Sequence, residues 1–309
     1  LFYGLAIRIP IFPMHGWLPL FITHGNIAVG PILFLGLKVG IYGLIRFILP
    51  LLPDAVMQWQ ELIIGMALFG IFYAAFLATR QNNLRRLLAF AIISHSSILL
   101  IALFSLNKEG FMGSIFLALN FGLAISSLLV MTGLIWQRTG TIDINKLGGL
   151  FNIIPFVGVA FLLASLAIIG MPLTPGFDGV HLMLEASIHR FGGLVAIAAS
   201  IGNVIAAAFL LRAFQRAFLS TPKKTVSWNM SPMYLTEIVL AGTVIIATLS
   251  VGFHSKPWLE LINTATEPLG TFYDALHEKQ KISEREEAQE NLPSPSGNPI
   301  TIPVHTKGI

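Results

Sequence analysis

The chain has 309 residues, of which 55% are hydrophobic and only 11% are charged, and its mean hydropathy is +0.77. Soluble domains are about 25% charged, so this composition excludes a soluble globular protein and indicates a polytopic membrane protein. The net charge of +4 comes from basic residues between apolar stretches, a pattern of membrane topology and not of nucleic-acid binding, and the lack of cysteine excludes disulfides and thiolate-held metal sites.

Apolar stretches of about 20 residues are the units that can cross a membrane. Residues 1–9 are predicted to be the end of a helix, and a Pro-rich turn follows them. The first residue is Leu1 and not Met, inside this apolar segment, so we expect the chain to be truncated or processed at its start. Further helices are predicted at residues 28–50, 58–79, 87–106, 111–137, 153–170, 193–219 and 235–254.

Residues 171–190 differ from the other stretches because they combine several Pro and Gly residues with titratable side chains. Such a segment suits the second half of a broken helix whose freed backbone groups are buried in protein or line a wet cavity. Loop charges favour a single broken crossing over 153–190, because it leaves nine basic residues on one side of the membrane and two on the other. The nine are Arg80, Arg85, Arg86, Arg138, Lys146, Arg212, Arg216, Lys223 and Lys224, and the two are Lys108 and Arg190.

The end of the chain is more polar. Residues 1–254 are predicted to form the transmembrane helix bundle. Residues 255–277 are amphipathic and are predicted to lie at the membrane interface or along neighbouring helices, with a frayed linker as the alternative. Residues 278–309 are polar and Pro-rich, so they are predicted to be a disordered tail or to lie over a partner.

Lys38 lies at the centre of the apolar stretch 28–50. A basic side chain in the middle of a membrane span is costly and commonly marks an ion or proton pathway, although Lys38 could instead pair with a neighbouring helix for packing alone. Arg46 follows eight residues later, close to two helical turns, so both side chains are predicted to share a face with Tyr42 between them. Arg46 could alternatively extend to the interface.

Other polar residues inside the spans have two interpretations each. His95 is either a proton relay, since histidine titrates near neutral pH, or a neutral hydrogen-bonded side chain. His181 and Glu185 are helical neighbours at i and i+4, and they either end a proton path or belong to a helix end at the interface. Asn120 is predicted to make a contact between helices. No catalytic triad, phosphate loop, dinucleotide fingerprint or zinc motif occurs, so no catalytic, cofactor-binding or metal site is predicted.

Several ordered motifs carry a family resemblance. They are RIPIFPMHGWLP (8–19), LKVGIYGLIR (37–46), RQNNLRRLLAFAIISHSS (80–97), KLGGL (146–150) and GMPLT (170–174). On these motifs, over about residues 1–262, the chain resembles the antiporter-like membrane subunits of respiratory complex I, the subunit-4 type in particular. The resemblance implies an all-α fold, namely the second part of a fourteen-helix subunit with two broken helices, with about six earlier helices absent from this chain.

The resemblance also implies a function. The chain would contribute to proton translocation in a complex I-type NADH:quinone oxidoreductase, without a cofactor of its own. NADH, flavin, iron–sulfur clusters and quinone would be bound by partner subunits. Its partners would be other membrane-arm subunits and membrane lipids, with no nucleic acid. The missing N-terminal helices would either precede this chain or be carried by a separate partner chain. The protein would be integral to the mitochondrial inner membrane or to a bacterial cytoplasmic membrane.

Residues in the matching motifs and in the broken helix form the predicted proton pathway. Lys38 is expected to change its protonation state, and His95 is expected to relay protons with the region of His181 and Glu185. Arg8 is expected to act as a fixed charge beside Lys38. The pathway prediction as a whole comprises Lys38, Arg8, His95, His181, Glu185, Arg46 and His15.

The sequence departs from the family pattern at three positions. Arg8 replaces a lysine, Phe121 replaces a histidine, and Val180 replaces an acidic residue. These departures support a second hypothesis, in which the chain is a degenerate structural module that no longer pumps. A third hypothesis places it in a related cation/proton antiporter, membrane hydrogenase or inorganic-carbon uptake complex, all of which use similar subunits.

Overall fold

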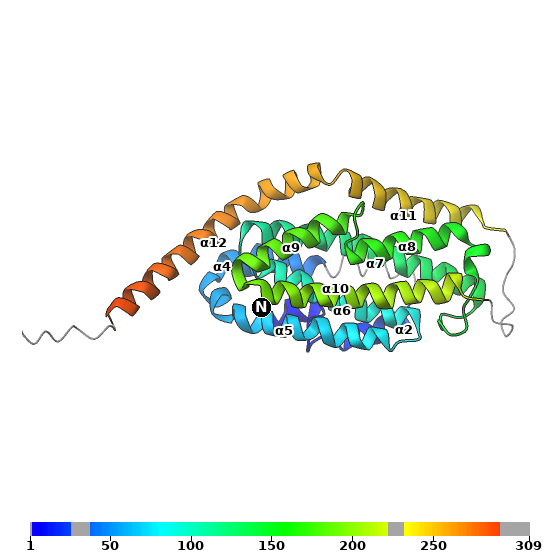
Figure 1. The fold of residues 1–309 in the computed structure, drawn as a ribbon, viewed down its shortest axis with the longest axis horizontal. Coiled ribbons are helices and arrows are strands. Elements are labelled where there is room, and N and C mark those ends of the chain that lie inside the picture. Colours follow the sequence, from blue (N-terminus) through cyan, green and yellow to red (C-terminus); the bar gives the residue numbers. More distant parts are fainter. Residues whose placement is uncertain (1, 26–37, 222–231, 291–309) are drawn as a thin grey trace, which may run out of the picture.

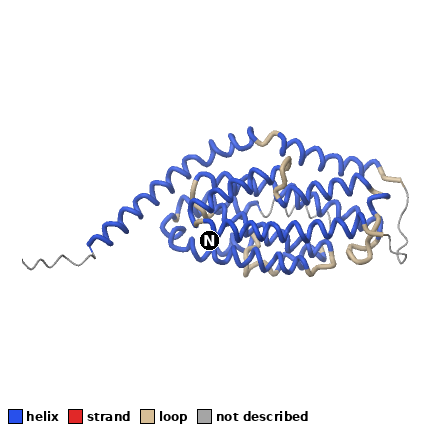
Figure 2. Tube along the Cα trace, viewed as in Figure 1, coloured by secondary structure: helices blue, strands red, loops and turns tan. Residues whose placement is uncertain are grey.

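The structure is a computed structural model, and it describes residues 2–25, 38–221 and 232–290. Within these ranges the elements are helices joined by loops (Figures 1 and 2). Their bounds are α1 Phe2–Arg8, α2 Trp17–His24, α4 Leu49–Leu51, α5 Pro53–Thr79, α6 Leu84–Leu103, α7 Lys108–Thr139, α8 Pro155–Ile169, α9 Pro175–Phe191, α10 Gly193–Phe214, α11 Leu235–Phe253 and α12 Lys256–Glu290. Short helical pieces of other types are η1 Leu44–Ile48, η2 Leu150–Asn152 and η3 Gln215–Leu219.

The predicted spans agree with these helices. Five of the helices in the described residues are long and apolar enough to cross a membrane, namely α5, α6, α7, α10 with η3, and α11. Asn83 and Asn107 fix the starts of α6 and α7, because their side chains accept hydrogen bonds from the first helical turns. Gly140 ends α7 in the left-handed conformation, at φ 66°. The predicted span 28–50 begins outside the described residues; residues 38–43 are helical and lead into the π-helical η1.

The predicted helix break after residue 170 is present. α8 ends at Gly170, which has a φ of 78°, and α9 begins at Pro175. The two helices follow one another along the bundle, so together they make one broken crossing (Figure 1). The predicted Pro-rich turn, residues 9–16, separates α1 from α2.

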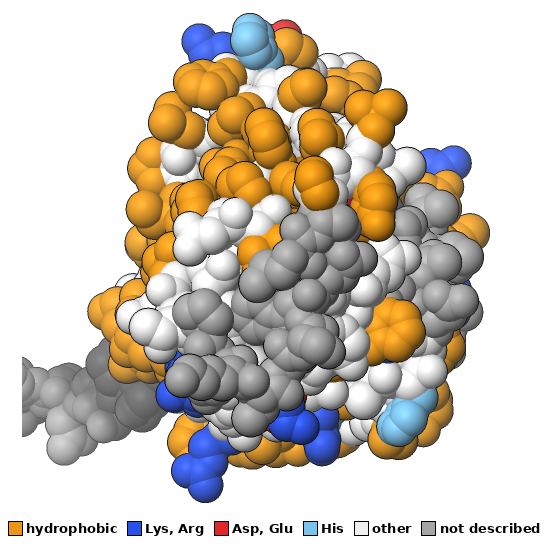
Figure 3. Space-filling view, turned by 90° about the vertical axis from the view of Figure 1, so that its right-hand side faces the viewer, with side chains coloured by type: hydrophobic (Ala, Val, Ile, Leu, Met, Phe, Trp, Pro, Cys, Tyr) orange, Lys and Arg blue, Asp and Glu red, His pale blue; other side chains and the backbone are white. Residues whose placement is uncertain are grey.

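The basic loops gather at one end of the bundle, as a single broken crossing requires. The Arg212 guanidinium donates to the carbonyl of Thr79 over 2.5 Å, and Arg216 donates to the Asn145 side chain over 2.8 Å. These bonds join the end of α10 to the end of α5 and to the loop after α7. Figure 3 looks onto this end and shows Lys and Arg side chains along its lower part. Lys223 and Lys224 lie outside the described residues.

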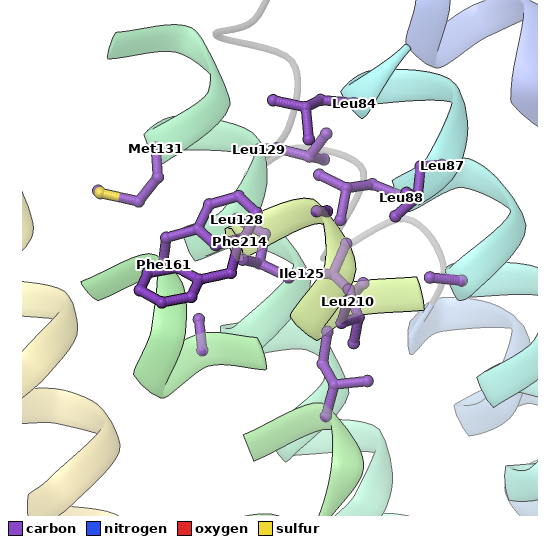
Figure 4. Packing of buried hydrophobic residues seen from close by; sticks show 14 of the residues in the cluster. Leu84, Leu87, Leu88, Ile125, Leu128, Leu129, Met131, Phe161, Leu210 and Phe214 are labelled. Carbon is purple, nitrogen blue, oxygen red and sulfur yellow. The ribbon is translucent and has the colours of Figure 1, made fainter. Parts of the chain in front are cut away.

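α6 is the central helix, and nearly all of its side chains are buried. Leucines on its first turns face the middle of α7, while Phe161 of α8 and Phe214 of α10 close the same cluster (Figure 4). A second cluster surrounds the other half of α6 and includes Phe104, Phe111 and Tyr273. A helix that is apolar on all sides is expected to lie inside a bundle, which α6 does.

α12 differs from the sequence prediction. Its first half packs against the bundle through Ile262, Thr266 and Tyr273, and the Tyr273 hydroxyl donates to the carbonyl of Leu49 over 2.8 Å. The helix continues to Glu290 and extends past the bundle (Figure 1), so the prediction of disorder is wrong for residues 278–290. This stretch consists largely of Glu, Lys, Gln, Arg and Ala, which favour helix even without a packed face. Residues 291–309 lie outside the described residues.

Candidate functional site

Lys38 and His95 line the same cavity. Its volume is about 30 Å³, and its wall also contains Ser96, Phe121 and several apolar side chains. A site that holds one water needs roughly 10–15 Å³, so this cavity has room for water. Packing in the bundle has therefore brought together the two titratable residues that the sequence singled out at mid-span.

The helix that carries Lys38 presents Ile41, Leu44 and Ile48 to the core. Lys38 lies on the same side as Ile41 and reaches the cavity, whereas Tyr42 and Arg46 are exposed. The predicted face shared by Lys38, Tyr42 and Arg46 is therefore wrong. On this helix Ile41, three residues after Lys38, points towards the core. The π-helical η1 begins at Leu44 and contains Arg46, so it changes the direction in which the Arg46 side chain points.

His95 is held on α6 by its own helix. Its Nδ1 lies 2.9 Å from the carbonyl oxygen of Ala91, and its ring meets the Phe121 ring edge to face, at 4.9 Å between centroids and 80° between planes. The imidazole also lies close to the Asn203 side chain and to the backbone of Ile168. Only 1% of His95 is exposed, so it is an interior group and not part of a solvent-facing surface.

The broken end of α8 lies beside His95. Asn120 of α7 donates its amide to the carbonyl of Ala167 over 2.9 Å, which confirms the predicted contact between helices. Asn203 of α10 donates to the carbonyl of Ile169 over 2.6 Å. These two asparagines satisfy carbonyls that the helix break leaves without intrahelical partners. Sequence reasoning missed Asn203, although it is an isolated amide within the apolar stretch 193–219.

The remaining members of the predicted pathway do not line this cavity. Arg8 is exposed at the end of α1, with its Cβ near Gly40 on the Lys38 helix. His15 is buried in an aromatic group, stacked on Phe12 at 5.6 Å and meeting Tyr73 at 5.3 Å. Both Arg8 and His15 therefore lie outside the wall of the Lys38–His95 cavity.

His181 and Glu185 lie on the exposed face of α9. α9 packs closely against α7 through its glycines, because a Cβ on Gly179 would lie 2.8 Å from the Leu117 side chain. His181 follows two positions later, on the opposite side of the helix. Val180 packs against Gly170 at the helix break.

This arrangement can move a proton. A lysine and a histidine that line one cavity with room for water can exchange a proton through water, and histidine can accept it on one nitrogen and release it from the other. Within the described ranges, no group of three or more His, Asp or Glu side chains is placed to hold a metal ion.

Comparisons with known proteins agree with the fold and with the motifs. The family described as "NADH:quinone oxidoreductase/Mrp antiporter, TM" matches residues 1–206. NADH-quinone oxidoreductase subunit M of Rickettsia prowazekii is 30% identical over 273 residues, which are 87% of this chain and 55% of that protein. NADH-ubiquinone oxidoreductase chain 4 of Marchantia polymorpha is 29% identical, over 87% of this chain and 54% of that protein.

A chain in the structure of respiratory complex I from Thermus thermophilus with bound NADH superimposes with a TM-score of 0.80 and 28% identity, over 87% of this chain and 57% of that chain. The chain thus spans about half the length of the curated relatives it matches. It is an integral membrane protein, and it belongs to the NADH:quinone oxidoreductase/Mrp antiporter membrane family.

Proposed function

We propose that the chain is a membrane-arm subunit of a complex I-type NADH:quinone oxidoreductase and that it carries protons through the Lys38–His95 cavity. The observation that carries this proposal is the shared cavity of about 30 Å³. Lys38 is half-buried and His95 is buried, on different helices. An apolar pair would pack at these positions equally well, and ionisable groups inside a membrane bundle usually serve transport.

In this proposal Lys38 takes up and releases a proton, and His95 receives it through water in the cavity. Arg8, with its Cβ near the Lys38 helix, supplies a fixed positive charge at the cavity's edge. His15, Arg46, His181 and Glu185 are outside the cavity wall, so their role would be in proton entry or exit, or in contact with partner subunits.

The chain would act as part of an assembly. We propose that other membrane-arm subunits cover its exposed apolar faces and that a preceding segment or a separate chain supplies the helices that complete the subunit. NADH, flavin, iron–sulfur clusters and quinone would be bound by partners. Residues 1–254 would be the membrane bundle, in a bacterial cytoplasmic or mitochondrial inner membrane, and residues 255–277 would lie at its interface.

A non-pumping module is the second candidate. It is favoured by the phenyl ring of Phe121 in the cavity wall and by the outward position of His181 and Glu185. In that case the assembly would keep this chain for docking alone. The number of protons moved per electron separates the two candidates, because a silent module lowers the ratio while electron transfer continues.

Membership in the assembly is tested by gentle purification of the chain from its native membrane and identification of the subunits that accompany it by mass spectrometry. We expect flavin, iron–sulfur and quinone-site subunits. Hydrogenase subunits, carbonic-anhydrase-like subunits or purely antiporter subunits would overturn the proposed assembly while leaving the fold unchanged.

A further inference from the structure

We propose that a polar groove between the end of α9 and the second half of α12 binds the head group of an aminophospholipid, a lipid that carries a phosphodiester and a primary ammonium. The groove has a volume of about 490 Å³, and residues of the loop between α6 and α7 complete its wall. It is separate from the Lys38–His95 cavity, and its occupation does not depend on proton transfer through the chain.

Charged side chains of both signs line the groove. The cations are Arg190 from α9 and Lys281 and Arg285 from α12. The carboxylates are Asp274 and Glu278, both from α12. In the part of the chain that the structure describes, none of the four charged α12 side chains in this wall forms an ion pair. The groove therefore presents positive and negative groups that a ligand can pair.

Arg190 is held in place by a buried side chain. Its Nη2 donates to Oε1 of Gln60 over 3.0 Å, and the Gln60 amide donates to the carbonyl of Phe104 over 2.6 Å. Gln60, on α5, is only 4% exposed. An arginine that is already oriented loses little side-chain freedom on binding, and its planar guanidinium matches the oxygens of a phosphate group. Arg190 is therefore suited to hold the phosphodiester.

His277 contributes a second group to the same part of the groove. Its Nε2 is buried and has no hydrogen-bond partner among the described residues. Burial, with Arg190 and Lys281 as neighbouring cations, lowers the pKa of His277 to about 4, so its imidazole is neutral at pH 7. A neutral imidazole can donate an N–H from Nε2, and a phosphate oxygen at this place would satisfy an atom that is otherwise unpaired.

The two signs of charge lie in different parts of the groove. Along α12 the carboxylates come first, at Asp274 and Glu278, and the cations follow at Lys281 and Arg285. These positions are three or four residues apart, so they share one face of the helix. Burial and the neighbouring Glu109 carboxylate raise the pKa of Asp274, so a cation at the acidic part would be favourable. A dipolar head group satisfies both parts, because its phosphodiester meets the cations and its ammonium meets the carboxylates.

The groove lies at the depth where a membrane places its head groups. α12 reaches the end of the bundle at Gly270, which lies against Lys108 at the start of α7, and it continues past this end (Figure 1). Close to Arg190 along the chain, Ile188 and Leu194 are 51% and 79% exposed. These apolar side chains can contact the acyl chains of a lipid whose head group occupies the groove.

Photo-crosslinking of the purified assembly in lipid nanodiscs tests this proposal. The probe is phosphatidylethanolamine with a photoreactive acyl chain, and mass spectrometry identifies the labelled peptides. We expect label on the peptides that carry Ile188 or Leu194 and on the part of α12 that lines the groove. Absence of label from these peptides would overturn the site, whatever the assembly pumps.

Competition by unlabelled compounds identifies the head group. Phosphatidylethanolamine should displace the probe at about tenfold lower concentration than phosphatidylcholine, because a quaternary ammonium has no N–H to donate to the carboxylates. Phosphatidylglycerol and inorganic phosphate should also compete more weakly, because neither has an ammonium. Equal competition by phosphatidylcholine, or stronger competition by phosphatidylglycerol or inorganic phosphate, would overturn recognition of an aminophospholipid.

Two variants test the two parts of the groove, and both replace exposed side chains on which the fold does not depend. Lys281→Gln should lower the label about threefold. Lys279→Gln, which replaces an exposed lysine of α12 outside the groove wall, is the matched control and should leave the label unchanged. Glu278→Gln should remove the preference for phosphatidylethanolamine over phosphatidylcholine. Equal label in the two lysine variants, or a preference that survives Glu278→Gln, would contradict the proposal.

Discussion

Arg138, at the end of α7, and Glu237, at the start of α11, form a buried ion pair with two parallel contacts. Nε lies 2.7 Å from Oε1 and Nη2 lies 2.5 Å from Oε2, and the two side chains are 3% and 4% exposed. The Arg138 guanidinium also lies over the Tyr234 ring, 4.7 Å from its centroid. The pair joins α11, whose surface is otherwise largely exposed in this chain, to the central bundle.

Loss of one partner of this pair should destabilise the chain strongly, because the other charge stays buried and unpaired. We expect Glu237→Gln to lower the free energy of unfolding by about 3–5 kcal/mol. A denaturant titration of the purified assembly measures this change.

The exposed pair Lys108–Glu267 is the matched control, with 3.8 Å between Nζ and Oε1 and side chains that are 41% and 57% exposed. Glu267→Gln should cost about 0–1 kcal/mol. Equal losses of unfolding free energy for the two substitutions would show that burial does not govern the contribution of the Arg138–Glu237 pair to stability.

Gly176 is predicted to be required for the close approach of α9 to the end of α8 and to Asn120. A Cβ at this position would overlap the carbonyl oxygen of Ala167 and lie 2.9 Å from Nδ2 of Asn120. Gly176→Ala should therefore cost about 1–3 kcal/mol and displace the Asn120 amide. Gly65→Ala on α5 is the control, because a Cβ there meets nothing within 4 Å, and it should be neutral or slightly stabilising. The melting temperatures of the assemblies with Gly176→Ala and with Gly65→Ala are compared with that of the unaltered assembly. An unchanged melting temperature for Gly176→Ala would contradict the prediction.

The contact between α12 and the bundle should weaken in acid. Burial, with Arg190 and Lys281 as neighbouring cations, lowers the pKa of His277 from 6.5 to about 4. The unfolded chain therefore binds a proton at His277 before the folded chain does, so stability falls as the pH drops from about 6.5 to about 4. His277→Gln should flatten that fall.

Melting temperatures at pH 7 and pH 5 test the role of His277, with the exposed His254→Gln as the control. We expect the acid-induced decrease to be smaller for His277→Gln than for the unaltered protein, and unchanged for His254→Gln. A decrease of the same size in all three would exclude His277 as the cause.

Much of the fold follows from the sequence because membrane spans and breaks have strong local signals. Apolar stretches predicted the positions of α5, α6, α7, α10 and α11, and the Pro and Gly residues of 171–176 predicted the break before α9. The balance of loop charges selected one broken crossing. The end of α12 was missed, because polar composition was interpreted as disorder although most residues of 278–290 favour helix.

The site could be predicted only in part. Lys38 and His95 are conspicuous as isolated polar residues in apolar helices, but their shared cavity depends on how the helices are rotated, which one sequence does not state. The rotation of α9 was in fact indicated by Gly176 and Gly179, whose lack of side chains permits close packing on α7 and turns His181 outward. The sequence marks Asn203 only as one amide side chain within an apolar helix.

The measurement that tests the account most directly is the number of protons moved per electron by the assembly with Lys38→Ala. Proton uptake into native membrane vesicles, recorded together with NADH oxidation, gives this ratio. Lys38→Arg keeps the charge but does not readily release a proton, and Lys146→Ala removes an exposed lysine as the control. We predict a lowered ratio for both Lys38 variants and an unchanged ratio for Lys146→Ala. A ratio with Lys38→Ala equal to that of the unaltered assembly would contradict proton transfer through this chain.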